Sequence, residues 1–170
     1  MYSNRKKLYL MIGPAGSGKT TWIKKHAAPG TSAHISRDRI RFNMVKEDEH
    51  YFSREKEVYM EFIRQICRAI SYETKWVDEI YIDATHLTKH SREKLVKEIY
   101  CFGNFELIAV IVKPALEQCL AQNAQRSGRE YVPENAIRNM YKSFQHPWND
   151  DLNYDMIIEN DEIIYGKVEE

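Results

Sequence analysis

Residues 13–20 constrain the fold of this chain more than any other feature. They read GPAGSGKT and match the spacing G-x-x-x-x-G-K-[ST] in full, directly after the apolar run LYLMI at 8–12 and before a helical pattern from Thr20 to His26. In this context the backbone N–H groups of the loop point into one concavity, with the positive end of the helix dipole behind them. The pattern predicts a phosphate-binding loop that holds a nucleoside triphosphate.

Two side chains of this loop, and one acid elsewhere, are expected to have distinct roles. Lys19 is expected to reach the β- and γ-phosphates, and the Thr20 hydroxyl to face Mg²⁺. Asp83 ends the apolar segment EIYID and can hold Mg²⁺ from a neighbouring strand, although a solvated strand-end carboxylate is the alternative. The expected nucleotide-binding residues are Gly13, Pro14, Ala15, Gly16, Ser17, Gly18, Lys19, Thr20 and Thr21.

Apolar runs alternate with helical patterns along the chain. The expected strands are 8–12, 33–35, 79–84, 105–112, 155–160 and 162–166, and the expected helices are 20–26, 53–72, 91–103, 115–126 and 134–145. Ser53 is expected to cap the second helix and Gly103 to end the third. The alternation predicts an α/β fold of the P-loop NTPase type, with a parallel sheet covered by helices on both faces. Because no repeat or low-complexity linker interrupts residues 1–170, a single domain is expected.

The charge distribution and the cysteine content indicate which kind of ligand and which cellular compartment to expect. The net charge is zero, but residues 1–41 hold nine Lys and Arg against one acid, and residues 149–170 hold eight acids against one Lys. This balance argues against non-specific coating of nucleic acid, while the basic block suits an anionic ligand. No apolar run approaches the length of a membrane span, and three widely spaced cysteines are typical of reduced thiols. We therefore expect a cytoplasmic protein.

The segment HISRDRIRFN at 34–43 places Asp38 among Arg37, Arg39 and Arg41. It follows a short expected strand, and ligands of open α/β sheets lie beyond the carboxyl ends of the strands. A carboxylate there can accept the proton of a hydroxyl that attacks the γ-phosphate, while the arginines hold anionic parts of the acceptor. A structural Arg–Asp pair is the alternative.

Four segments together carry a family resemblance. GPAGSGKTT, SRDRIR, IDATHLT and QRSGREYVPENAIRNMYKS follow one another between roughly residues 8 and 145. In this order they resemble the P-loop kinases of the polynucleotide 5′-hydroxyl kinase type, as found in bacteriophage, within the AAA and zeta-toxin-like kinase group. The resemblance implies an adenylate-kinase-like architecture with a small lid at about residues 122–133, and ATP and Mg²⁺ as cofactors.

The resemblance also implies roles for single residues. Asp38 matches the general base, and Arg41 matches the arginine that contacts a phosphate of the acceptor. Arg126 is the best match to a lid arginine that clamps the donor phosphates in the transition state, with Arg129 as the second choice. The polar segment QNAQRSGRE, with Gly128 between two arginines, has a composition that suits a mobile closing loop. The expected catalytic residues are therefore Asp38, Lys19 and Arg126.

Three departures from the family pattern concern the acceptor side. Arg39 replaces an acid, His86 replaces an asparagine, and Gln122 replaces an arginine. The donor side is unaffected by these changes, whereas the identity of the acceptor is left open.

Three functions remain in competition. The first is transfer of the γ-phosphate of ATP to the 5′-hydroxyl of a polynucleotide or to a nucleotide. The second is a small-molecule kinase of the same fold, acting on a sugar, nucleoside or nucleotide-sugar. The third is an ATP-binding switch without acceptor chemistry, which Asp38 and the lid arginines argue against.

Overall fold

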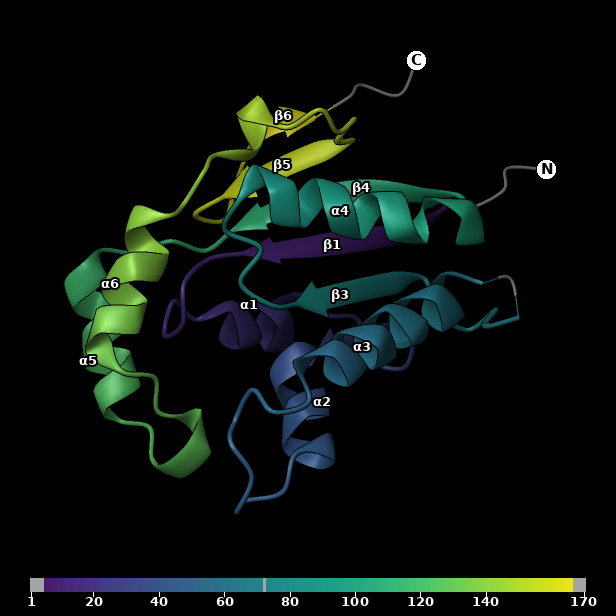
Figure 1. Ribbon diagram of the computed structural model, residues 1–170. Helices are drawn as coiled ribbons and strands as arrows, with labels where there is room; N and C mark the ends of the chain where they lie inside the picture. The colour runs from purple at the N-terminus through teal and green to yellow at the C-terminus, as the bar shows by residue number, and fades with distance from the viewer. Residues whose placement is uncertain (1–4, 72, 167–170) are drawn as a thin grey trace.

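The structure, a computed structural model, describes residues 5–71 and 73–166. Within these residues six strands form one sheet in the order β2-β3-β1-β4-β5-β6 (Figure 1). The strands are β1 (Lys6–Ile12), β2 (Ser32–Ser36), β3 (Glu79–Asp83), β4 (Phe105–Ile111), β5 (Met156–Glu159) and β6 (Glu162–Gly166). The helices are α1 (Lys19–His26), α2 (Arg37–Met44), α3 (Glu55–Ile70), α4 (Lys89–Ile99), α5 (Leu116–Ala124) and α6 (Glu134–Lys142), with 3₁₀ turns η1 (Tyr100–Phe102), η2 (Gly128–Glu130) and η3 (Pro147–Asn149).

Helices cover both faces of this sheet, as the alternation of the sequence predicts. On β1, Leu10 points into the larger core with Phe62 of α3 and Leu95 of α4. The next residue, Met11, points to the other face and packs with Ile23 of α1. Alternate side chains of a strand lie on opposite faces, so a strand covered on both sides is apolar throughout. This explains the unbroken run LYLMI.

The sheet is parallel except at its last strand. β1 pairs in parallel with β3 and β4, β2 with β3, and β4 with β5. β6 instead pairs antiparallel with β5, across a turn in which Asn160 and Asp161 have φ values of 52° and 64°. A two-residue turn of this kind closes a hairpin, whereas a parallel connection needs a dozen or more residues. The expected parallel sheet is therefore present over β1 to β5, and β6 adds one antiparallel strand at its edge.

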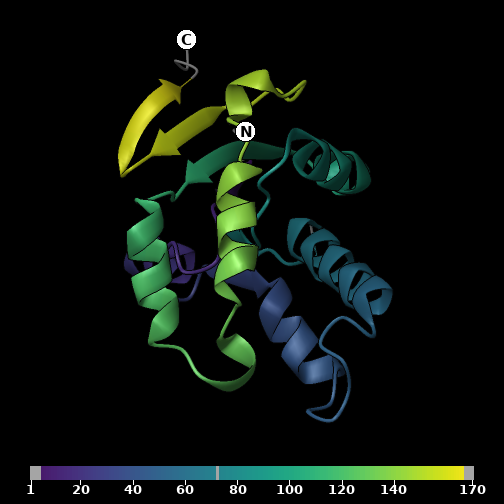
Figure 2. The same ribbon diagram turned by 60° about the vertical axis from the view of Figure 1, so that its left-hand side comes forward.

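The carboxyl ends of the parallel strands share one edge, and several segments gather there. Figures 1 and 2 show α5 and α6 side by side beyond this edge, with the loop between them reaching toward the end of α2. The loops after β1 and β3 open at the same edge, and α2 follows β2 directly. This arrangement brings the phosphate-binding loop, Asp83, Asp38 and the lid segment (residues 122–133) to one side of the molecule.

Several expected element boundaries are corrected. The segment after β2 forms a helix, α2, whose first turn is capped by the Ser36 hydroxyl accepting from the Arg39 backbone N–H. α3 begins at Glu55 rather than at Ser53, and its expected end near Tyr72 lies outside the described residues. α4 begins two residues early, at Lys89 after the capping Thr88 side chain, and ends at Ile99 before η1. Gly103 ends η1 in an extended conformation, where an added Cβ would lie 2.7 Å from Ile70 Cγ2.

The acidic and basic ends of the sequence meet within the chain. Asp161 pairs with Lys25 at 3.2 Å, and Asp155 pairs with Arg5 at 3.7 Å. Lys167 and the two final acids lie outside the described residues. None of the helices that the structure describes combines the length and apolar character needed to cross a membrane.

Candidate functional site

The loop that joins β1 to α1 is shaped by glycines whose backbone no other residue adopts easily. Gly16 and Gly18 have φ values of 75° and 97°, in the left-handed region, and Gly18 caps α1. A Cβ at Gly16 would lie 2.4 Å from the Cys119 carbonyl oxygen of α5. The loop is therefore held in its curve both by its own glycines and by close packing against the helix that leads into the lid segment.

The Lys19 ammonium lies inside this loop. Its Nζ donates to the Gly13 carbonyl at 3.0 Å and to the Pro14 carbonyl at 2.8 Å, and it lies 3.5 Å from the Ser17 hydroxyl. Burial lowers the pKa of Lys19, while the charges of Asp83 and Asp38 oppose that effect. A buried cation inside a glycine-rich loop at the N-terminus of a helix fits the phosphates of a nucleotide. Of the other expected loop residues, Ala15 is half-buried and Thr21 is exposed on α1.

Thr20 and Asp83 meet across the gap between α1 and β3. The Thr20 hydroxyl donates to Asp83 Oδ2 at 2.9 Å, and His34 Nε2 lies 2.9 Å from the same oxygen. Burial alone would raise the pKa of Asp83, but the hydrogen bonds from His34 and Thr20, with the Lys19 charge, hold it below the usual value. The carboxylate is therefore ionised at neutral pH.

The Thr20 and Asp83 oxygens are the kind of ligand that Mg²⁺ prefers. Within residues 5–71 and 73–166 no group of three His, Cys, Asp or Glu side chains could hold a metal by itself. Mg²⁺ commonly binds to one or two protein oxygens together with substrate phosphates, so the donor set fits a metal shared with a nucleotide. His34 was not identified from the sequence, because no local pattern shows that a strand residue of β2 reaches Asp83.

Asp38 occupies the first turn of α2 with 69% of its side chain exposed. Its Oδ1 accepts from Arg41 Nη1 at 2.5 Å and from the Tyr51 hydroxyl at 3.2 Å. Burial lowers the pKa of Lys19, and the charge of Asp38 offsets part of that lowering. The structure therefore brings Asp38 and the phosphate-binding loop into one electrostatic site, with the carboxylate oriented and open to solvent.

The three arginines around Asp38 do not form an open basic cluster. Arg41 is almost fully buried and makes a forked pair with Glu55 of α3, with Nη2–Oε2 at 2.8 Å and Nε–Oε2 at 3.1 Å. Arg37 pairs with the same carboxylate, while Arg39 is exposed. Glu55 therefore pairs with two of the three arginines that are expected to hold anionic parts of the acceptor. No local sequence pattern pointed to Glu55, since it lies on another helix, α3.

The two arginines of the lid segment, Arg126 and Arg129, have different surroundings. Arg129 donates to the Val45 carbonyl at 2.8 Å and lies over the Phe42 ring at 5.1 Å, so it holds the end of α2. Arg126 is exposed, and its charge lowers the pKa of Lys19. The buried Asn123, which no local sequence pattern indicated, holds the two ends of this loop together. Its Nδ2 donates to the Val132 carbonyl at 2.7 Å, and its Oδ1 accepts from the Val132 N–H at 3.0 Å.

His86, one of the three departures from the family pattern, contacts the end of β1, just before the phosphate-binding loop. It is buried in a left-handed conformation with φ 42°, and its Nδ1 lies 3.0 Å from the Met11 carbonyl oxygen. Because that partner is an acceptor, Nδ1 must carry the proton. Burial lowers the pKa of His86 to about 4, so the imidazole is neutral at pH 7.

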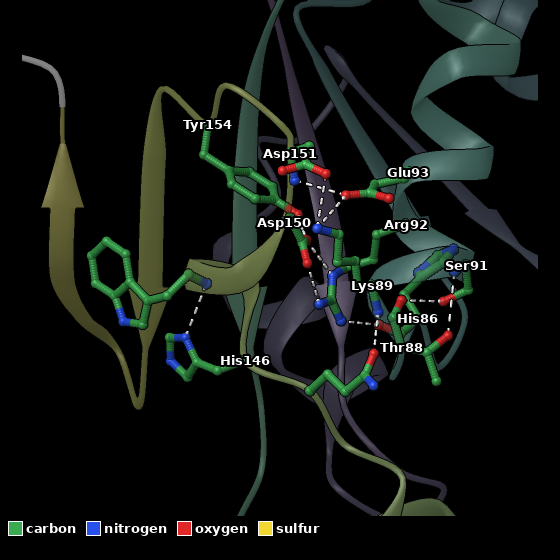
Figure 3. A network of polar contacts seen from close by, with 12 residues as sticks. His86, Thr88, Lys89, Ser91, Arg92, Glu93, His146, Asp150, Asp151 and Tyr154 are labelled. Atoms are coloured by element: carbon green, nitrogen blue, oxygen red, sulfur yellow. Dashed lines mark hydrogen bonds and ion pairs between the residues drawn. The ribbon is translucent and has the colours of Figure 1, made fainter.

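A buried network fixes the backbone of this histidine (Figure 3). Arg92 Nη1 donates to the His86 carbonyl at 2.9 Å, and the same guanidinium makes two 2.6 Å bonds to Asp150. Tyr154 donates to Asp150 as well, at 2.6 Å, and Lys89 pairs with Asp151. The connection that follows α6 is therefore anchored, through Arg92, to the loop after β3 that carries His86.

Comparison with known proteins agrees with this architecture. The family model described as AAA domain matches residues 8–147. A chain of the Pnkp1/Rnl/Hen1 RNA repair complex superimposes with a TM-score of 0.66 at 16% identity, covering 82% of this chain and 44% of that one. A fungal RNA kinase gives 0.62 at 16% identity, covering 93% and 78%, and a gluconokinase from Sinorhizobium meliloti gives 0.55 at 12% identity, covering 91% and 83%.

These likenesses show a shared fold. The chain spans less than half the length of the matched chain in the RNA repair complex. A fungal RNA kinase, a gluconokinase and a sugar kinase occur together among the similar structures, so the fold implies nucleotide binding without fixing an acceptor.

Proposed function

Because the chain belongs to the AAA domain family over residues 8–147 and has the fold of P-loop kinases, we propose that it transfers the γ-phosphate of ATP to a hydroxyl group. The acceptor that we propose is the 5′-hydroxyl of a polynucleotide or of a nucleotide. The observation that carries this proposal is the position of Asp38. This exposed carboxylate is oriented by Arg41 and Tyr51, and its charge opposes the lowering of the Lys19 pKa by burial. An ATP-dependent switch has no use for such a group, because it needs a positioned water and a surface for a partner instead.

Each residue then has one task. Asp38 accepts the proton of the acceptor hydroxyl, whose oxygen forms a bond to the γ-phosphorus as the bond to the bridging oxygen of ADP breaks. Lys19 and the lid residue Arg126 neutralise the charge on the transferring group, where fixed cations contribute most. Thr20 and Asp83 would hold Mg²⁺, which would supply further charge neutralisation on the phosphates.

A small-molecule kinase remains the second candidate, and one observation favours it. Glu55 pairs with both Arg37 and Arg41, so Arg39 is the exposed cation of that trio. A polynucleotide gains affinity from every phosphate that the protein neutralises, so a partly neutralised site favours short or neutral acceptors.

The test is a panel of acceptors with ATP labelled in the γ-phosphate. It includes 5′-hydroxyl RNA and DNA oligonucleotides, 3′-nucleotides, nucleosides, gluconate and other sugars. Label should enter the 5′-hydroxyl oligonucleotides and be absent from the same oligonucleotides carrying a 5′-phosphate. Lys19→Ala provides the inactive control. Label in a sugar alone would replace the polynucleotide proposal with the second candidate, and ATP hydrolysis without any labelled acceptor would reject the kinase proposal.

A further inference from the structure

Three aromatic side chains gather beside Asp38, on α2 and on the connection between α2 and α3. The Tyr51 and Phe52 rings meet edge to face, with centroids 4.8 Å apart and planes at 87°. Phe42 meets Tyr51 in the same manner at 6.1 Å. The Arg41 guanidinium lies 4.8 Å from the Tyr51 centroid and 5.3 Å from that of Phe52. We refer to Phe42, Tyr51 and Phe52 as the aromatic cluster.

The aromatic cluster borders both parts of the proposed acceptor site. At one side, the Tyr51 hydroxyl donates to Asp38 and accepts from Arg41 Nη1, each at 3.2 Å. At the other side, the lid residue Arg129 lies over the Phe42 ring. A molecule whose hydroxyl meets Asp38 therefore has the aromatic cluster beside it, beneath the lid segment.

Phe52 is the member of the cluster that is open to solvent. Its side chain is 57% exposed and takes no part in either core cluster. A single exposed aromatic residue is ordinary on a protein surface and carries no argument by itself. Phe52 differs because its ring is fixed by contacts with Tyr51 and Arg41, the two residues that also orient Asp38.

We propose that the base of the acceptor nucleotide stacks on Phe52 while its 5′-hydroxyl meets Asp38, so that the substrate class is a base-bearing nucleotide and not a sugar. This inference rests on the kinase function proposed above. In a nucleotide, the base and the 5′-hydroxyl are carried at opposite ends of one ribose. The site offers a corresponding pair of groups, the Phe52 ring for the base and the Asp38 carboxylate for the hydroxyl. Both groups contact Arg41 and Tyr51. Stacking of a base on an aromatic side chain contributes about 1–3 kcal/mol and tolerates any base. The exposed Arg39, in the turn that carries Asp38, is available for a phosphate of the same strand.

The experiment compares two acceptors that differ only in the stacking group. One is a short 5′-hydroxyl oligonucleotide, and the other is the same strand with an abasic 5′-terminal nucleotide. The quantity measured is the ratio of their kcat/KM values at fixed ATP. For the wild type we expect a ratio of about 10 or more, the equivalent of one stacked base. In Phe52→Ala the ratio should fall close to one, and in Phe52→Trp it should be retained.

Phe102→Ala is the matched control. Phe102 is 49% exposed on η1, before β4 and so at the opposite edge of the sheet, and its removal should leave the ratio at the wild-type value. A nucleoside 3′-monophosphate tested beside the oligonucleotide separates a free nucleotide acceptor from a strand end, since both carry the base.

The possible outcomes distinguish a failure of the stacking inference from a failure of the proposed kinase function. If the wild type phosphorylates no 5′-hydroxyl acceptor, the proposed function fails. If the wild type phosphorylates both acceptors with a ratio of one, or if Phe52→Ala keeps the wild-type ratio, the function stands and the stacking inference is overturned.

Discussion

The guanidinium of Arg129 donates a hydrogen bond to the backbone carbonyl of Val45 at 2.8 Å. Val45 is the C-cap residue of α2, so this bond joins the lid segment to the helix that carries Asp38. Arg126, three residues earlier, is exposed and contributes its charge to the surroundings of Lys19. The two arginines of the lid segment therefore have different structural positions.

This difference predicts different kinetic effects. Arg126→Ala should reduce kcat by about 10³–10⁵-fold, the range for an arginine that stabilises phosphoryl transfer, with a much smaller change in the KM for ATP. Arg129→Ala should reduce kcat less and should lower the free energy of unfolding, because it removes the bond to Val45. Steady-state kinetics of the two variants tests the assignment. A larger loss of kcat in Arg129→Ala would exchange their roles.

The buried His86 predicts a pH dependence of stability. Burial lowers its pKa in the folded protein to about 4, below the ordinary value of 6.5, so the unfolded chain binds more protons between these values. Its contribution to stability is therefore full above pH 6.5 and is lost as the pH falls toward 4, by about 3 kcal/mol. Urea unfolding at a series of pH values between 7 and 4.5 measures this effect.

The conservative variant isolates His86 from the other titrating groups. Asparagine tolerates the left-handed backbone found at His86, so His86→Asn should fold and should lose this part of the pH dependence. His90→Asn, at an exposed position, should keep the wild-type dependence. Equal pH dependence in wild type and His86→Asn would show that His86 is not the titrating group.

The buried Arg92–Asp150 pair predicts a strong, non-additive effect on folding. Both side chains are fully buried, so removing one partner leaves the other charge without compensation. Arg92→Met should destabilise the fold by about 3–5 kcal/mol, whereas the double variant Arg92→Met/Asp150→Leu should lose less than the two single variants combined. Denaturant unfolding midpoints of the wild type, Arg92→Met, Asp150→Leu and the double variant give the interaction energy of the pair.

Lys89→Met provides the comparison for this cycle, since Lys89 pairs with Asp151, whose side chain is 86% exposed. A surface ion pair contributes at most about 1 kcal/mol. A loss in Arg92→Met no greater than that in Lys89→Met would contradict the role given to the buried pair.

Local patterns predicted most of the fold. The apolar runs located all six strands, because strands covered on both faces are apolar throughout and LYLMI is such a run. The antiparallel direction of β6 was not predicted, because apolar content does not report strand direction; the Asn160–Asp161 turn was the available signal. α2 was missed because its charged residues hide the helical period, although Ser36 at its N-cap indicated a helix start.

The candidate site was predicted where it depends on one segment and missed where it depends on two. The spacing of residues 13–20 located the phosphate-binding loop, since backbone geometry there follows from the local sequence. Glu55, His34 and Asn123 were missed because each acts through a partner far along the chain or across a loop. Long-range side-chain pairing is set by the packing of elements, which the sequence pattern of one element does not contain.

In the proposed reaction, Asp38 deprotonates the hydroxyl that receives the γ-phosphate. Asp38→Asn keeps an oxygen to accept from Arg41 and Tyr51 but removes the proton acceptor, and Asp48→Asn, at an exposed acid before α3, is the control. The measurement is single-turnover transfer from labelled ATP to a 5′-hydroxyl oligonucleotide, with ATP affinity determined separately. We predict a rate lower by about 10²–10⁴-fold in Asp38→Asn with ATP affinity nearly unchanged. An unaltered rate, or loss of ATP binding in its place, would contradict the account.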